Sequence, residues 1–156
     1  MGMDRELISE LAYKIRARRE VESAEDQLQL LRFRLKETQA PKLFEELGKA
    51  LAGRVEALRD QLGDLGSDLA VRRDHTGINI SKDDSPFVKF KLEKPDYSGE
   101  LRGVYNSGHH KPVGDDKMIV VQLAVGSDDI VFFRLDERRM TADELADHIM
   151  PLLFLR

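Results

Sequence analysis

The N-terminal part of the chain has the apolar spacing of long amphipathic helices. Residues 4–38 contain neither glycine nor proline and are rich in good helix formers. One series of apolar residues here repeats at alternating spacings of four and three, which is the pattern of a narrow coiled-coil stripe. We call this series the seam: Ala17, Val21, Ala24, Leu28, Leu31 and Leu35. A shorter stripe precedes it: Leu7, Ile8, Leu11 and Ile15.

Pro41 predicts that the first helix ends or kinks near Gln39, because proline lacks an amide hydrogen and disfavours helical dihedral angles at the preceding residue. A second helix is expected from Pro41 to about Leu62. The two helices either fold back as a hairpin or continue as one kinked rod that pairs with another subunit. The short connection favours the hairpin.

Residues 63–68 form the clearest boundary, because the apolar period changes there from helical to alternating. Strands are then expected near residues 69–72, 78–81, 87–93, 100–105, 118–125 and 130–135. The last two are nearly all apolar, so we expect both of their faces to be covered. Thr141 and Glu144 form a capping box that begins a terminal helix.

This order of elements predicts an α+β fold. It consists of a long N-terminal helical hairpin with coiled-coil character, a mainly antiparallel sheet of about six strands and a C-terminal helix. We expect residues 1–65 to form the helical arm or hairpin, and residues 66–156 to form the β-sheet domain with its terminal helix.

Composition narrows the class of protein. Charged residues make up 35% of the chain, against roughly 25% in ordinary domains, which suits long solvated helices. The net charge of -4 disfavours nucleic acid as a partner, and no apolar run has the length that would predict a membrane span. The absence of cysteine excludes disulfides and thiolate metal sites, and it predicts a cytoplasmic protein.

Few residues suggest catalysis. The glycines have no phosphate-loop or dinucleotide spacing, and no serine stands in a nucleophile elbow, so we expect neither a cofactor nor an enzyme. The long irregular segment 106–116 is a possible ligand loop, with candidate residues Asn106, His109, His110 and Asp115. Adjacent histidines rarely converge on one metal ion, so a solvated loop is the preferred interpretation.

We therefore predict a non-enzymatic interaction or adaptor protein that self-associates, as a dimer, through its helical arm and presents a β domain to a protein partner. The predicted interface residues are Val21, Leu28, Leu31, Leu35, Leu47, Leu51, Leu58 and Leu62. One alternative is a small-ligand or nucleic-acid module that uses the 106–116 loop and a sheet face. The basic residues of that face are Lys89, Lys91, Lys94 and Arg102, and its candidate stacking residues are Phe87, Tyr97 and Tyr105. The other alternative is a hydrolase using His109 and His110.

Overall fold

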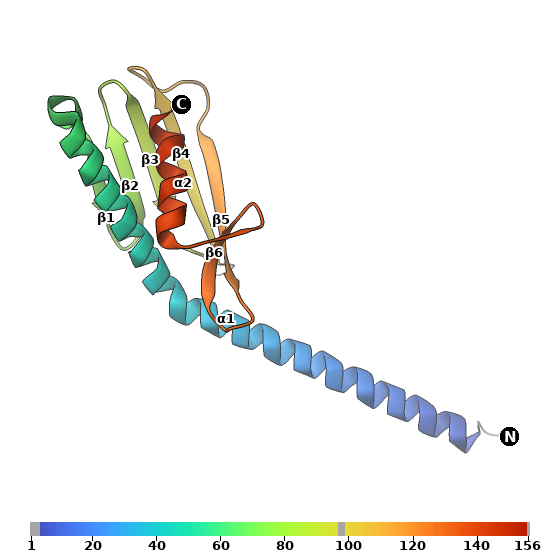
Figure 1. The fold of residues 1–156 in the computed structure, drawn as a ribbon. Helices are drawn as coiled ribbons and strands as arrows, with labels where there is room; N and C mark the ends of the chain where they lie inside the picture. The colour runs from blue at the N-terminus through green and yellow to red at the C-terminus, as the bar shows by residue number, and fades with distance from the viewer. Residues whose placement is uncertain (1–3, 97–98, 156) are drawn as a thin grey trace.

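A long helix, an antiparallel sheet and a terminal helix make up the protein in a computed structural model that describes residues 4–96 and 99–155 (Figure 1). Helix α1 spans Arg5–Leu62, and a short 3-10 helix, η1, follows at Gly63–Gly66. The strands are β1 (Ala70–Arg73), β2 (Gly77–Lys82), β3 (Phe87–Glu93), β4 (Glu100–Gly108), β5 (Lys117–Val125), β6 (Val131–Leu135) and β7 (Arg138–Met140). Helix α2 spans Ala142–Phe154. The predicted α+β class is confirmed.

The predicted helical hairpin is wrong, because α1 is one helix that continues through Pro41. A proline inside a helix costs about 3 kcal/mol or more. Contacts on both sides of it oppose this cost: the side chain of Gln39 bonds the β5–β6 connection and the start of β6, and Leu43 and Phe44 pack against the core. The direction of α1 changes in this region (Figure 1), as expected for a kink at proline.

The sheet is a simple meander in which each strand pairs antiparallel with the next one in the chain. It has seven strands and not about six, because the chain turns at Asp136 and Glu137 and adds the short strand β7. Both turn residues have positive φ, 49° and 66°. Tight hairpin turns of this kind usually carry Asn or Gly, so the Asp-Glu pair gave no turn signal.

The predicted alternation is confirmed in β3, where Val88, Phe90 and Leu92 are buried and the lysines between them are exposed. Phe90 lies opposite Ile80 of β2 and Tyr105 of β4, so one face of the sheet carries a continuous apolar surface. The expectation that both faces of β5 are covered is wrong. Met118 is 61% exposed on the other, open face.

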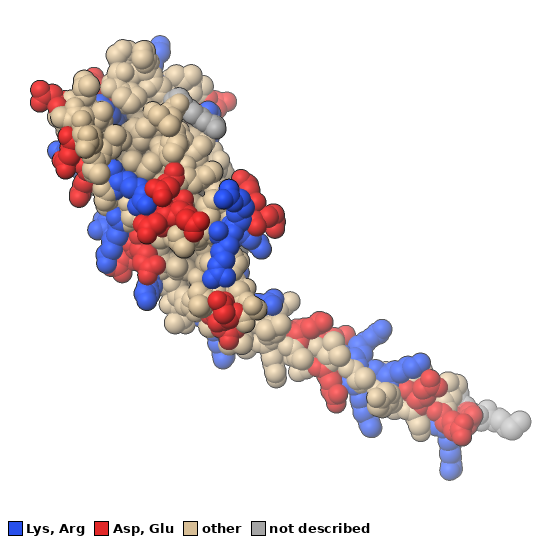
Figure 2. Space-filling model, viewed as in Figure 1, with Lys and Arg blue, Asp and Glu red and all other residues tan. Residues whose placement is uncertain are grey.

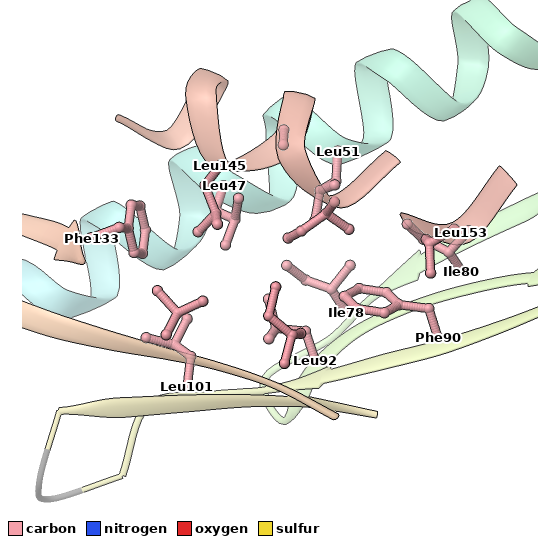
Figure 3. Packing of buried hydrophobic residues seen from close by; sticks show 14 of the residues in the cluster. Leu47, Leu51, Ile78, Ile80, Phe90, Leu92, Leu101, Phe133, Leu145 and Leu153 are labelled. Carbon is pink, nitrogen blue, oxygen red and sulfur yellow. The ribbon is translucent and has the colours of Figure 1, made fainter. Parts of the chain in front are cut away.

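The C-terminal half of α1 and helix α2 lie together over the apolar face of the sheet (Figure 1). Leu47 and Leu51 from α1 meet Leu145 from α2 above Ile78 and Leu92 of the sheet (Figure 3). All five side chains are buried. One core therefore joins the two helices to the strands. The division of the chain at residue 65 stays a prediction.

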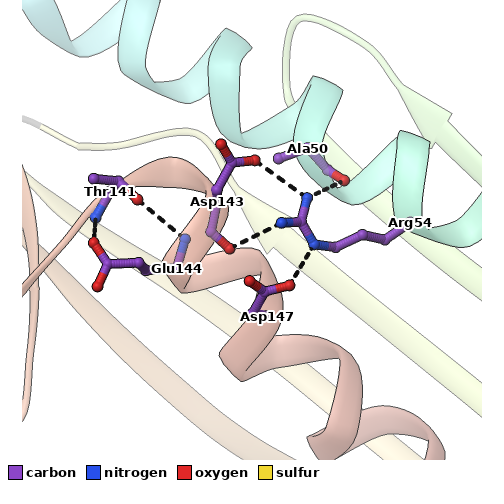
Figure 4. A network of polar contacts seen from close by, with 6 residues as sticks. All are labelled: Ala50, Arg54, Thr141, Asp143, Glu144 and Asp147. Atoms are coloured by element: carbon purple, nitrogen blue, oxygen red, sulfur yellow. Dashed lines mark hydrogen bonds and ion pairs between the residues drawn. The ribbon is translucent and has the colours of Figure 1, made fainter.

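Polar contacts hold the two helices together at the edge of this core (Figure 4). The Arg54 guanidinium donates to the carboxylates of Asp147, at 2.7 Å, and Asp143, at 3.3 Å. The predicted capping box is confirmed: the Glu144 amide donates to the Thr141 hydroxyl, and the Thr141 amide donates to the Glu144 carboxylate. In the part of the chain that the structure describes, no helix combines the length and apolar character that crossing a bilayer requires.

Candidate functional site

The N-terminal half of α1 projects beyond the sheet and forms a free arm (Figure 1). We use the name arm for residues 5–38 of α1. Apolar side chains along this arm are exposed: Leu7, Ile8, Leu11, Ile15, Val21, Leu28, Leu30, Leu31 and Phe33. Charged side chains of both signs lie between them (Figure 2), so the arm carries no field of a single sign. This uncovered apolar stripe makes the arm the candidate functional surface.

The seam faces away from the core. At about 100° per residue, its mean direction lies roughly 140° around the helix from that of the core-facing residues Leu43, Leu47, Leu51, Val55 and Leu58. Val21, Leu28 and Leu31 are 58%, 46% and 45% exposed. Leu35, at the base of the arm, is half-buried and packs partly against the core. The sheet of the same chain therefore leaves most of the seam open.

The eight predicted interface residues divide into two groups in the structure. Val21, Leu28, Leu31 and the half-buried Leu35 lie on the arm. Leu47 and Leu51 have 0% exposure in the core of the chain itself, and Leu58 and Leu62 are half-buried. Leu47 and Leu51 thus offer no surface to a partner. Apolar residues recur every three or four positions in both halves of the helix, so the sequence did not distinguish the half that packs on the sheet from the half that stays exposed.

The side chain of Gln39 fixes the base of the arm. Its amide group donates to the Asp129 carbonyl at 3.0 Å, and its carbonyl oxygen accepts from the Val131 amide at 2.9 Å. The first bond reaches the connection between β5 and β6, and the second reaches the first residue of β6, about ninety positions further along the chain. No sequence signal pointed to Gln39, because glutamine is common in helices and its two partners are remote in the sequence.

A shallow apolar cavity of about 470 Å³ lies beside this base. Phe33, Pro41 and Phe44 from α1 line one side of it, and Pro95 and Leu123 line the other. Tyr97, one of the predicted stacking residues, belongs to the neighbouring loop and lies outside the described residues. Four charged residues also line the cavity: Lys36, Glu37, Lys94 and Asp96.

The candidate ligand loop is organised by Asn106. This side chain is 3% exposed, donates to the Gly114 carbonyl and the Asp116 carboxylate, and accepts from the Val113 amide at 3.0 Å. His109 and His110 are exposed, with ring centroids 5.2 Å apart, and Asp115 is exposed as well. Asn106 therefore closes the loop on itself, and this role gives its burial a structural cause.

Residues of this loop line a cavity of about 610 Å³ together with Pro86 and the end of α2. His109 and Asp115 are among the lining residues, whereas His110 is not. Among the described residues, no three His, Asp or Glu side chains lie close enough together to hold a metal ion. Ser107, His109 and Asp115 all line this cavity, and the hydrolase alternative stays a prediction.

The open face of the sheet carries the predicted basic residues. Lys89, Lys91 and Arg102 are exposed there, and Arg102 donates to the Glu100 carboxylate at 2.8 Å. That hydrogen bond and the negative charge of Glu100 raise the pKa of Arg102 above its ordinary value. Tyr105 points into the core and is 8% exposed, so it cannot stack a base on this face.

One buried charge has a structural explanation. Lys82 is 1% exposed, and its ammonium donates to the Asp68 carboxylate at 2.6 Å and to the Asp84 carbonyl at 3.2 Å. The other Asp68 oxygen accepts the amides of Asp83 and Asp84, and these contacts, led by Lys82, lower the pKa of Asp68. The pair fixes the turn between β2 and β3.

Comparison with protein-family models, curated proteins and solved structures finds no match to this chain.

Proposed function

We propose that the protein is a non-enzymatic interaction protein that self-associates through its helical arm and presents its β domain to a protein partner. The observation that carries this proposal is the exposure of the seam, in which Leu28 and Leu31 are 46% and 45% exposed. Most helical stability in proteins comes from packing an apolar face and not from the helix-forming tendency of the residues alone. A second copy of the arm offers the seam a matching apolar surface.

The open face of the sheet is the surface we assign to the partner. Val104 lies opposite Met118, and Arg102 lies opposite Val120, so three exposed apolar side chains cluster across β4 and β5. Lys91 pairs with Val104 from the next strand and adds a charge at the rim. An apolar centre with a charged rim is the usual composition of a protein interface.

Two neighbouring leucines provide a matched test of self-association. Leu30 and Leu31 are 49% and 45% exposed, but only Leu31 belongs to the seam. We expect Leu31→Arg to convert the protein to a monomer and Leu30→Arg to leave the dimer intact. Light scattering on the full-length variants measures the molar mass, and circular dichroism checks that both remain folded. Equal masses for the two variants would contradict a role for the seam.

Nucleic-acid binding is the second candidate, because Lys89, Lys91 and Arg102 lie exposed on one face. Titration with single-stranded RNA and DNA at low salt is the test. Binding through these side chains must weaken as salt rises and must fall in a Lys89→Glu, Lys91→Glu variant. A flat titration would remove this candidate and leave the protein-partner proposal unaffected.

A further inference from the structure

We propose that two arms pair antiparallel, with Leu28 of each copy beside Ala24 of the other. In this arrangement the residue numbers of any two facing residues add up to about 52, so the two-fold axis of the pair passes near Asp26. The inference rests on the proposed self-association and adds its orientation and register. It follows from the sizes of the seam residues and from the charges that flank them.

The size pattern of the seam fits this register along its whole length. In heptad terms Val21, Leu28 and Leu35 occupy the first core position, and the remaining seam residues occupy the second. Antiparallel helices pack a first position against a second one. The proposed register sets Val21 against Leu31, Leu28 against Ala24 and Leu35 against Ala17, and each contact occurs twice. A shift by one heptad would bring Lys14 or Thr38 into the core.

Flanking charges favour the same register. Glu20, Gln27 and Arg34 run along one edge of the seam, and Arg18, Glu25 and Arg32 run along the other. Helical side chains lean toward the N-terminus of their own helix. The two helices of an antiparallel pair run in opposite directions, so side chains that lean toward each other come from residues whose numbers add to slightly more than 52. On one edge this brings Glu20 of each copy to Arg34 of the other.

The second edge behaves in the same way. There Glu25 with Glu25 and Arg18 with Arg32 have numbers that add to 50, but these side chains lean away from each other. The side chains that lean toward each other are Glu25 of each copy and Arg32 of the other, so the pair of arms gains four contacts of opposite charge from the two edges. Neither Glu25 nor Arg32 makes an ion pair within the described residues, and both are exposed. Their charges are thus available to a second copy.

The parallel arrangement lacks this complementarity. In a parallel, in-register pair, Glu20 of one copy would lie against Glu25 of the other, and this like-charge contact would occur twice. Gln27 would face Arg32, which adds no opposite charge.

The antiparallel pair also keeps the two β domains apart. Gln39 lies thirteen residues from the centre, so the bases of the two β domains would be about 40 Å apart along the arms at 1.5 Å per residue.

A charge exchange tests the orientation through the sign of its effect. Glu25→Arg places arginine against arginine in the antiparallel dimer, and we expect the dimer dissociation constant to rise roughly ten-fold at low salt. Adding Arg32→Glu restores the pairs and should restore the affinity. Glu22→Arg makes the same change on the outer face of the arm and should leave the affinity unchanged. In a parallel dimer Glu25→Arg would strengthen association, because it relieves the contact with Glu20.

Distances between spin labels test orientation and register independently. The chain has no cysteine, so Ser9→Cys or Ser23→Cys supplies one labelling site per chain, and both serines are exposed on the arm. The proposed register puts the two Ser9 positions about 50 Å apart along the arms and the two Ser23 positions about 9 Å apart. Double electron-electron resonance on the spin-labelled full-length dimer measures both separations.

Each outcome has a distinct meaning. A long Ser9 separation with a short Ser23 separation, together with weakening by Glu25→Arg and rescue by Arg32→Glu, supports the proposal. Short separations at both sites overturn the orientation. A shift of one heptad changes both separations along the arms by about 10 Å, to roughly 40 and 2 Å or roughly 61 and 20 Å, and such a pair of values overturns the register. Self-association survives in both cases. A protein that is monomeric at every concentration overturns the proposed function itself.

Discussion

Replacing Leu51 with alanine tests whether the C-terminal half of α1 is part of the core that holds the sheet. Leu51 has 0% exposure and lies between the two helices and the strands (Figure 3). The matched control is Leu30→Ala, which makes the same change on the arm, where the leucine is 49% exposed. Both variants keep the helix-forming tendency of α1, because alanine is the best helix former.

The size of the effect follows from burial. Leucine-to-alanine changes in cores cost about 2–5 kcal/mol, through lost transfer free energy and the cavity left behind. For a chain of this size each kcal/mol lowers the melting temperature by roughly 2–4 °C, so a cost of about 3 kcal/mol gives a fall of roughly 6–12 °C. An exposed substitution changes the free energy of unfolding by no more than about 0.5 kcal/mol.

Thermal unfolding followed by circular dichroism measures both variants. It is done at a low protein concentration, at which association contributes least to stability. We expect a clear fall in melting temperature for Leu51→Ala and almost none for Leu30→Ala. Equal melting temperatures would refute the assignment of α1 to the core, and they would favour a helical unit independent of the sheet.

Three further predictions concern the polar contacts. Gln39→Ala removes two hydrogen bonds of about 0.5–1.5 kcal/mol each. In hydrogen exchange the Val131 amide should therefore exchange faster, while amides of the core are unchanged. Unchanged exchange at Val131 would contradict the anchoring of the arm. Asn106→Ala removes the three hydrogen bonds that close the 106–116 loop. It should lower the free energy of unfolding in urea by about 1–3 kcal/mol and speed proteolysis within that loop. A loop as resistant to proteolysis as before would refute this role. The hydrogen bond and charge of Arg54 lower the pKa of Asp147 below its ordinary value near 3.8. The pair therefore stabilises the folded state above that pH, and this contribution is lost as the pH falls through the lowered pKa. Asp147→Asn should flatten this part of the fall in unfolding free energy with acid, and an unaltered pH dependence would show that the pair contributes nothing.

Much of the fold could be predicted because local patterns decided it. The alternation of Val88, Phe90 and Leu92 with lysines defines the faces of β3, and the capping box at Thr141 defines the start of α2. Both signals depend on residues close in sequence. The exposed part of the seam was identified in the same way, because its spacing of four and three is a property of the helix alone.

The remaining features depend on contacts between distant residues. Pro41 predicted a break, but Gln39 on one side and Phe44 on the other hold the helix against the body, and neither contact can be inferred from local sequence. Leu51 and Leu31 each belong to an apolar series along the helix, yet the sheet covers Leu51 and leaves Leu31 exposed. Asn106 is polar in sequence and buried in the structure because the loop closes over it.

The most direct test of self-association is the molar mass of the unaltered full-length protein, measured by sedimentation equilibrium from micromolar to submillimolar concentration. We expect a mass that rises with concentration to twice the chain mass of 17.8 kDa. A mass that stays at 17.8 kDa over the whole range would contradict self-association.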